Sequence, residues 1–306
     1  MLKRFVRMLL LLFATSFFAG CGGEKETGEK ALISAGLPPV AWIAEQICGA
    51  PVPSALPEGR SPHDFTPHPA VIGSIAASRV FLKAGMPFEE HVADAVSRGT
   101  TRVADVSKGI RRIPMSADGE ACCHEHHHHH EKNADAHAHG DSDAMDPHIW
   151  LSPANCRIIA ENILQELEKA DPANLEHYRE NYRKLVQKLD DAERIMQEKL
   201  APWKGRSFFV HHPAFGYYAA AAGLHQSGIE LGGREPSPAR LAEVIERARK
   251  HQVKTIFVQP QFNPASARAL AEAIGGNAAE LDPLAADVVA NFARITEGII
   301  KGFEAK

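Results

Sequence analysis

The stretch that decides the fold is Asp171–Pro202, DPANLEHYRENYRKLVQKLDDAERIMQEKLAP. Asp171-Pro172 has the form of an N-cap followed by a first helical residue. Apolar side chains then recur every three or four residues, the spacing of one helical face; they are Leu175, Tyr178, Tyr182, Leu185, Leu189, Ala192, Ile195 and Met196. A helix reaching Leu200 would run about 43 Å at 1.5 Å per residue, which is long for one globular domain. The stretch therefore predicts a rigid strut between two lobes, closed by Pro202.

The segments on both sides of this strut alternate short strands with helices. Before it, strands are expected over 31–35, 52–56, 79–83 and 102–105, and helices over 40–48 and 70–77. After it, strands are expected over 207–210, 255–258 and 278–281, and helices over 239–250, 265–274 and 286–302. Such alternation implies parallel sheets. The expected fold class is α/β, with an N-terminal lobe (31–170) and a C-terminal lobe (203–306) joined by one long rigid linker helix (171–202).

The N-terminus has the form of a targeting signal. Met1–Met8 carries three basic residues and no acid, and Leu9–Phe18 is apolar or small. A basic start followed by a short apolar run predicts a signal peptide over 1–20. The apolar run is too short to span a bilayer of about 30 Å as a helix, which argues against a membrane anchor helix. The ending Ala-Gly-Cys resembles a bacterial lipobox, although Phe18 stands where Leu is usual. We therefore expect lipid on Cys21, followed by a flexible tether over 21–30.

Composition excludes several classes of protein. The 306 residues are 44% hydrophobic and 24% charged, which is globular and excludes wholesale disorder. The net charge of −4 argues against a nucleic-acid binder, which needs a basic face. Histidine is abundant at 17 residues, nine of them between His124 and His148, so the chain handles metal or protons.

The segment 116–144 is rich in Ala, Asp, Gly and His and has no apolar period, so we interpret it as a low-complexity loop. Its eight imidazoles form a candidate auxiliary metal-capture site: His124, His126, His127, His128, His129, His130, His137 and His139. The alternative is a solvated loop that binds metal without a role. The run HEHHH also matches the metalloprotease pattern H-E-x-x-H. That pattern needs an amphipathic helix beside a cleft, and the surroundings here predict none.

Four potential metal ligands stand in separate contexts: His63 in SPHDF, His148 in DPHIWLSP, His212 in HHPAFGYY and Asp282 in LDPL. Three imidazoles and a carboxylate suit Zn²⁺. Each ligand neighbours a proline, which stiffens its backbone. His212 and Asp282 follow predicted strands, where ligands bind in α/β sheets. Two ligands come from each lobe, so the metal would lie between the lobes. Spacing alone does not choose between His212 and its neighbour His211.

These stretches, together with EPSPARLAEVIERAR and IFVQPQF, resemble the ZnuA-type family, the extracytoplasmic solute-binding lipoproteins of zinc and manganese ABC importers. The resemblance covers the chain from about Ala31 to its end. It implies two α/β lobes bridged by a long rigid helix. It places His63, His148 and His212 on the family's histidine positions, with His212 rather than His211, and Asp282 on the acidic position.

The resemblance also implies a function. The protein would capture Zn²⁺ and deliver it to an ABC permease as a monomer, without catalysis, at the outer face of the cell membrane or in the periplasm. Manganese-type members tend to carry Glu at the third position, so His212 favours Zn²⁺ over Mn²⁺. Binding requires neutral imidazoles, so affinity should fall as the pH drops through about 6.5. The stiff strut predicts a small rearrangement of the lobes.

Three other functions stay open at this point. The first is a manganese or iron binder of the same fold. The second is a zinc hydrolase that keeps an exchangeable water and uses a base such as Glu243. The third is a periplasmic zinc buffer that acts only through the loop 116–144. Each makes a different prediction for metal preference, catalysis or the effect of deleting the loop.

Four cysteines remain besides Cys21. Cys48, Cys122, Cys123 and Cys156 allow three pairings in an oxidising compartment, and the sequence does not choose among them. Adjacent Cys122-Cys123 in the histidine-rich segment are equally interpretable as soft metal ligands.

Overall fold

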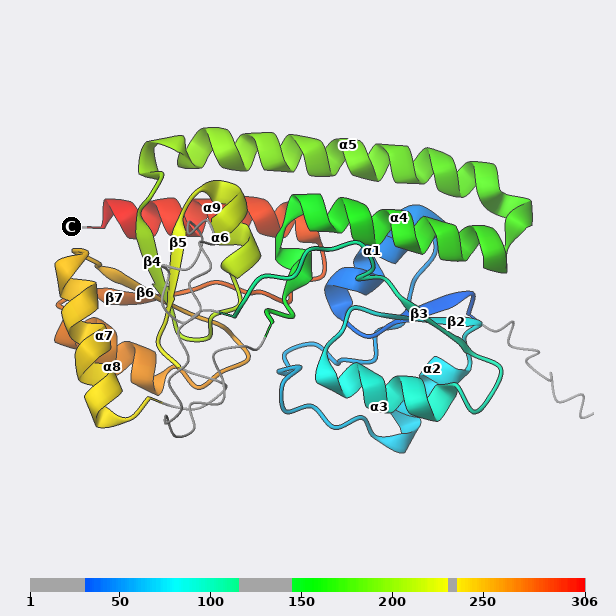
Figure 1. Cartoon of the computed structure of the whole chain (residues 1–306), viewed down its shortest axis with the longest axis horizontal. Coiled ribbons are helices and arrows are strands. Elements are labelled where there is room, and N and C mark those ends of the chain that lie inside the picture. Colours follow the sequence, from blue (N-terminus) through cyan, green and yellow to red (C-terminus); the bar gives the residue numbers. More distant parts are fainter. Residues whose placement is uncertain (1–30, 116–144, 231–235, 306) are drawn as a thin grey trace, which may run out of the picture.

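The computed structural model describes residues 31–115, 145–230 and 236–305. Two α/β lobes lie side by side beneath one long helix (Figure 1). The signal peptide (1–20), the lipidation site Cys21, the tether (21–30) and the histidine-rich segment (116–144) lie outside the described residues and stay predictions.

The N-terminal lobe contains a parallel three-stranded sheet in the order β1-β2-β3. Its strands are β1 (Ile33–Ala35), β2 (Val80–Lys83) and β3 (Arg102–Asp105). Its helices are α1 (Pro38–Cys48), α2 (Pro69–Ala76), α3 (Pro87–Val96), the 3₁₀ turn η1 (Ile149–Leu151) and α4 (Pro153–Ala170). A proline near the start of each of these α-helices sets φ where an N–H would be unpaired.

The C-terminal lobe contains a parallel four-stranded sheet in the order β5-β4-β6-β7. Its strands are β4 (Ser207–Val210), β5 (His225–Gly228), β6 (Thr255–Val258) and β7 (Asn277–Glu280). Its helices are α6 (Gly216–Ala222), α7 (Pro238–Lys250), α8 (Ala265–Ala273) and α9 (Val288–Glu304). The chain passes from β4 to β5 and then returns to the other side of β4, so the strand order reverses at β4. Ligand sites in such sheets lie at this reversal, beyond the strand ends.

The linker helix α5 (Leu175–Leu200) is flanked by the 3₁₀ turns η2 (Pro172–Asn174) and η3 (Ala201–Trp203). It begins later than the expected Asp171-Pro172. The carboxylate of Asp171 does not cap the helix, because it accepts hydrogen bonds from Tyr178 Oη (2.6 Å) and Asn174 Nδ2 (2.8 Å). Asp171 instead follows the last residue of α4, a helix that the sequence patterns did not predict.

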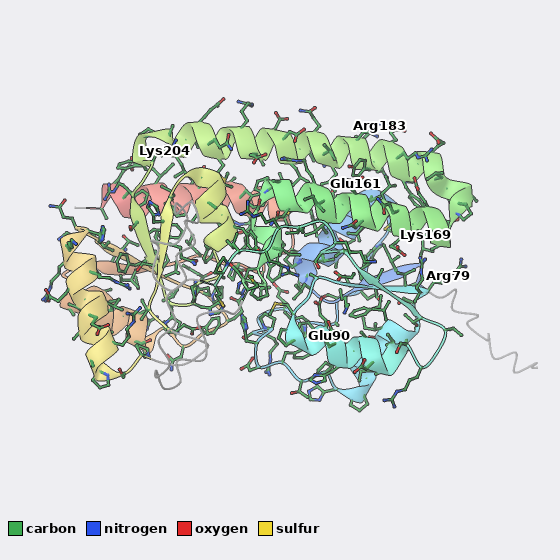
Figure 2. The ribbon with its side chains drawn as sticks, viewed as in Figure 1. Arg79, Glu90, Glu161, Lys169, Arg183 and Lys204 are labelled. Atoms are coloured by element: carbon green, nitrogen blue, oxygen red, sulfur yellow. The ribbon has the colours of Figure 1, made fainter. Side chains whose placement is uncertain are left out.

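A shared hydrophobic core joins the lobes to the linker. The buried face of α5 presents Tyr178, Leu185, Leu189, Met196 and Leu200, and α5 packs on α1, α4, α6 and α9. One continuous buried cluster contains side chains of both sheets, from Phe81 of β2 to Phe208 of β4. Polar side chains such as Glu161, Lys169 and Arg183 point outward (Figure 2). No helix in the described ranges has the length and apolar character to cross a membrane.

The expected strand over 52–56 is wrong. Only one bridge forms there, between Ser54 and Ala35. Pro51 and Pro53 lack the N–H groups that a longer ladder would need. Four elements were not predicted: the helices α3, α4 and α6 and the strand β5. The sequence of β5, HQSG, has no apolar pattern that would indicate a strand.

The two cysteines in the described ranges are both free thiols. Cys156 is buried and donates a hydrogen bond to the Trp150 carbonyl (3.1 Å), and Cys48 donates to the Ala50 carbonyl (3.2 Å). A disulfide between Cys48 and Cys156 is therefore excluded. Cys122 and Cys123 lie outside the described residues.

Replacing Leu189 with alanine should destabilise the protein by about 2–5 kcal/mol, because the side chain has 0% exposure in the middle of α5 and its removal leaves a cavity. Arg183→Ala, on the exposed side of the same helix, should stay within about 0.5 kcal/mol. Urea unfolding of both variants measures the difference. Equal losses would show that this face of α5 does not support the core.

Candidate metal centre

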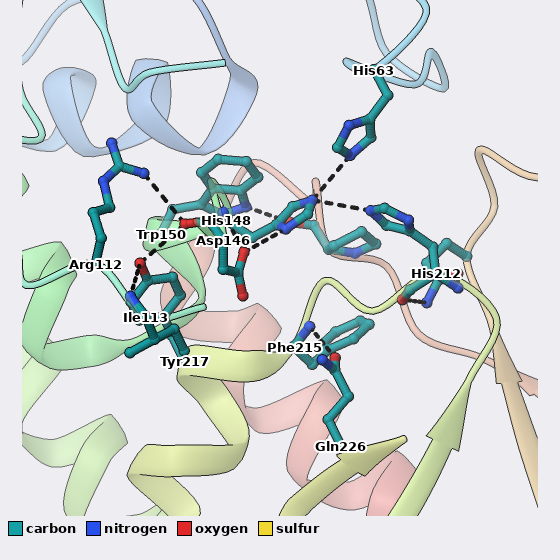
Figure 3. A network of polar contacts seen from close by, with 12 residues as sticks. His63, Arg112, Ile113, Asp146, His148, Trp150, His212, Phe215, Tyr217 and Gln226 are labelled. Carbon is teal, nitrogen blue, oxygen red and sulfur yellow. Dashed lines mark hydrogen bonds and ion pairs between the residues drawn. The ribbon is translucent and has the colours of Figure 1, made fainter. Parts of the chain in front are cut away.

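Three histidines from distant parts of the chain meet between the lobes (Figure 3). His63 lies in the loop before α2, His148 directly before η1, and His212 two residues after β4. Their Nε2 atoms face one another, with 3.1 Å from His63 to His148 and 3.2 Å from His148 to His212. His148 and His212 are buried, whereas His63 is exposed on the N-terminal side. The structure therefore brings together three of the four residues singled out in the sequence.

The spacing of these nitrogens suits a tetrahedral ion. Zn–N bonds of about 2.0–2.1 Å at tetrahedral angles separate two ligand nitrogens by about 3.3 Å. The distances from His148 Nε2 to the Nε2 atoms of His63 and His212 are nearly the same as this value. The three imidazoles can thus bind one zinc ion through Nε2 with small shifts, which leaves a fourth position.

A carboxylate fixes the ring of His148. Asp146 Oδ1 accepts hydrogen bonds from the backbone N–H (2.8 Å) and from Nδ1 (2.7 Å) of His148, and both side chains are buried. Because a carboxylate accepts and does not donate, we assign the His148 proton to Nδ1. The neutral ring then directs the Nε2 lone pair at the other two histidines. Such outer partners orient metal ligands and raise their basicity.

His212 has an equivalent partner in Glu230, which follows β5. Glu230 Oε1 forms a close hydrogen bond with His212 Nδ1. The buried amide of Gln259, directly after β6, accepts from the His212 N–H (3.0 Å) and donates to the His212 carbonyl (3.1 Å). The ring of Phe262 stacks on His212, with the ring centroids 4.9 Å apart. Both the backbone and the ring of His212 are thereby held in one orientation.

His211 points elsewhere. Its Nδ1 lies 3.4 Å from Ser266 Oγ, and its Nε2 lies 3.7 Å from Glu230 Oε2. It is not among the histidines that converge. The geometry therefore separates two adjacent histidines that spacing in the sequence could not.

Desolvation lowers the pKa of two of the converging imidazoles, those of His63 and His148. Desolvation, followed by repulsion from His212 and His148, lowers the pKa of His63 to about 2. Desolvation, followed by His212, lowers the pKa of His148 well below its usual value, although Glu230 opposes the shift. Burial raises the pKa of Asp146 to about 7, against the lowering effect of its His148 hydrogen bond. The pKa of Asp146 therefore lies in the pH range in which the loss of affinity is expected.

Asp282 does not join the three converging nitrogens. Its Oδ1 accepts hydrogen bonds from Gln261 Nε2 (2.8 Å) and from the Leu284 N–H (2.9 Å). It lines a cavity of about 190 Å³ between the lobes, opposite Glu58 and Arg60. Metal binding by Asp282 stays a prediction.

Other predicted site residues take different places. Glu243 is exposed on α7 and pairs with Arg240 at 3.2 Å, so it lies on a solvated helix face. The eight histidines of 116–144 lie outside the described residues. The supporting roles of Asp146, Glu230 and Gln259 were not predicted from the sequence. Asp146 could have been found in the quoted DPHIW, and Gln259 directly after a predicted strand, whereas Glu230 follows the strand that was not predicted.

Two parallel α/β lobes beneath a long helix, with three imidazoles meeting between them, are the architecture of a two-lobed metal-binding protein. The family model described as zinc-uptake complex component A, periplasmic, matches residues 33–299. The chain belongs to this ZnuA family.

Individual relatives agree with this membership. The high-affinity zinc uptake system protein ZnuA of Bacillus subtilis is 30% identical over 299 residues, which cover 93% of this chain and 90% of that protein. The zinc-binding protein AdcA of Streptococcus pyogenes serotype M3 is 31% identical over 229 residues, or 74% of this chain. This match spans only 44% of AdcA, less than half its length. A crystal structure of ZnuA matches with a TM-score of 0.78 at 28% identity, covering 89% of this chain and 99% of that one.

Zinc affinity should fall as the pH drops below about 7, because the Asp146 carboxylate then takes up a proton in the metal-free protein and must lose it again to support His148 beside Zn²⁺. Asp146→Asn should flatten this dependence between pH 5.5 and 7.5 and weaken binding by about 10–100-fold. Competition titrations against a chelator at several pH values measure both effects. An unchanged pH dependence in Asp146→Asn would exclude Asp146 as the titrating group.

Proposed function

We propose that this protein binds Zn²⁺ between its lobes through His63, His148 and His212 and delivers it to the permease of an ABC importer. The observation that carries the proposal is the convergence of three Nε2 atoms at the spacing of a tetrahedral zinc ion. The zinc uptake and zinc-binding names of the relatives support it. Either Asp282 or a water molecule would complete the coordination.

Binding, rather than catalysis, is favoured by the carboxylates around the site. A zinc hydrolase needs a general base that is within reach of the metal-bound water. Asp146 and Glu230 are both committed to the Nδ1 atoms of the ligands. Glu243, the other candidate base, is exposed and pairs with Arg240. The described site therefore holds an ion without equipping it to attack a substrate.

We also propose the cellular setting that the N-terminal residues predict. Residues 1–20 act as a signal peptide, lipid on Cys21 anchors the protein, and residues 21–30 form a tether outside the cell or in the periplasm. The protein acts as a monomer. The histidines of 116–144 capture additional Zn²⁺.

The ligand set should favour Zn²⁺ over Mn²⁺ by several orders of magnitude, because imidazole nitrogens suit zinc and oxygen ligands suit manganese. Titration with Mn²⁺ followed by displacement with equimolar Zn²⁺ measures this preference. Retention of Mn²⁺ in the presence of Zn²⁺ would instead support a manganese carrier of the same fold.

Calorimetric titration of Zn²⁺ into the mature chain tests the proposed site directly. Wild type should show one tight site, and His148→Ala should weaken it by at least about 100-fold, because it removes a ligand together with the Nδ1–H that Asp146 accepts. His91→Ala, an exposed histidine on α3, is the matched control and should bind as wild type does.

Deletion of 116–144 separates this proposal from a zinc buffer that acts through the loop. The flanking residues Pro114 and Met145 already form a bridge, so the two ends that the deletion joins lie close together. The tight site should survive this deletion. If the deletion abolishes tight binding while His148→Ala leaves it intact, the interlobe site is wrong and the buffer function replaces it.

A further inference from the structure

The backbone carbonyl of Asp146 is held by side chains from both lobes (Figure 3). The hydroxyl of Tyr217, on α6 of the C-terminal lobe, donates to it at 3.0 Å. Arg112 of the N-terminal lobe approaches it with Nη1 at 3.4 Å and donates from Nη2 to the Ala84 carbonyl at 3.1 Å. The residue that orients His148 is thus positioned partly by the opposite lobe.

Tyr217 also contacts Ile113, the residue that pairs with Asp146 through the backbone. Its hydroxyl accepts from the Ile113 N–H at 3.3 Å, and the Ile113 carbonyl accepts from the Asp146 N–H at 2.8 Å. Tyr217 is 6% exposed, so these hydrogen bonds are shielded from water. One hydroxyl therefore links Ile113 and Asp146, which pair through their backbones (the 113/146 pair), to α6.

The start of α6 packs closely against the Asp146 carboxylate, and this approach requires a glycine at position 216. A Cβ atom at Gly216 would lie 2.7 Å from Asp146 Oδ2 and 3.3 Å from Ile113 Cδ1. The absence of a side chain at Gly216 lets α6 approach the carboxylate that supports His148. The buried Gln226 of β5 anchors the same turn, because its Oε1 accepts from the Phe215 N–H at 2.5 Å.

One short segment, 212–217, therefore acts on two ligands. It supplies His212 to the site. Five residues later it supplies the hydroxyl of Tyr217, which holds Asp146, the residue that orients His148. Any movement of this segment away from the N-terminal lobe would separate His212 from His148 and release the Asp146 carbonyl together.

We propose that Tyr217 is a positioning residue for metal binding, which couples contact between the lobes to the orientation of His148 through Asp146. This inference rests on the proposed zinc site. It also assigns a route to metal release: a partner that draws α6 from the 113/146 pair loosens two ligands in one step.

Tyr217→Phe tests the coupling, because it removes the hydroxyl and keeps the ring. Tyr218→Phe is the matched control: Tyr218 is buried on the same helix, and its hydroxyl bonds Thr296 Oγ1 at 2.7 Å, away from Asp146. Tyr217→Phe should weaken Zn²⁺ binding by about five- to tenfold and raise the dissociation rate into a chelator. Tyr218→Phe should stay within about twofold of wild type, a change smaller than one lost hydrogen bond.

Two further measurements exclude a general loss of stability. In a His148→Ala background, Tyr217→Phe should have no additional effect on affinity, because its action passes through His148. Cobalt(II) bound in place of zinc should change its visible absorption spectrum in Tyr217→Phe and not in Tyr218→Phe. Gly216→Ala, which displaces the Asp146 carboxylate, is a second variant and should also lose its effect in the His148→Ala background.

The outcomes separate this inference from the proposed function. Wild-type protein that does not bind Zn²⁺, or His148→Ala protein that binds as tightly as wild type, would refute the zinc site itself. If wild type and His148→Ala behave as expected, equal affinity in Tyr217→Phe and wild type overturns the positioning role. An equal loss from Tyr217→Phe with and without His148 also overturns it, since the effect would then be structural.

Discussion

The structure depends on one electrostatic constraint: two imidazole lone pairs face each other at about 3 Å only if a cation or a proton lies between them. Asp146 and Glu230 impose this arrangement, because each takes the Nδ1 hydrogen of a histidine and turns its Nε2 inward. Burial lowers the pKa of His148, which opposes filling the gap with a proton. A metal ion with short bonds to nitrogen is the species that best relieves the repulsion.

The architecture around this site limits how far the ligands can separate. His63 and His148 belong to one lobe and His212 to the other, so the site exists only while the lobes remain in register. A hydrophobic core runs through both lobes, and α5 packs along it. Near the site, Trp150 Nε1 donates to the Pro283 carbonyl at 2.7 Å, and Tyr217 bonds the Asp146 carbonyl. These contacts favour a preformed site over a wide hinge, so little ordering free energy is spent on binding.

Sequence patterns predicted much of the fold because the relevant signals are local. The period of Leu185 and Leu189 placed α5, and the strands over 102–105, 207–210 and 255–258 are as expected. The patterns failed where local signals conflict or are missing. Prolines stop the ladder at 52–56, Asp171 bonds Tyr178 instead of capping α5, and β5 is polar.

The sequence by itself determined the α/β class, the linker helix and the residue types of the site, because periodicity and proline-flanked histidines are properties of neighbouring residues. Only the tertiary structure decided which atoms meet. It brings His63, His148 and His212 together, turns His211 to Ser266, and directs Asp282 Oδ1 to Gln261. It also pairs Glu230 with His212 and Tyr217 with Asp146. These contacts join residues far apart in the chain, and their distances follow from how the two lobes pack rather than from any local pattern.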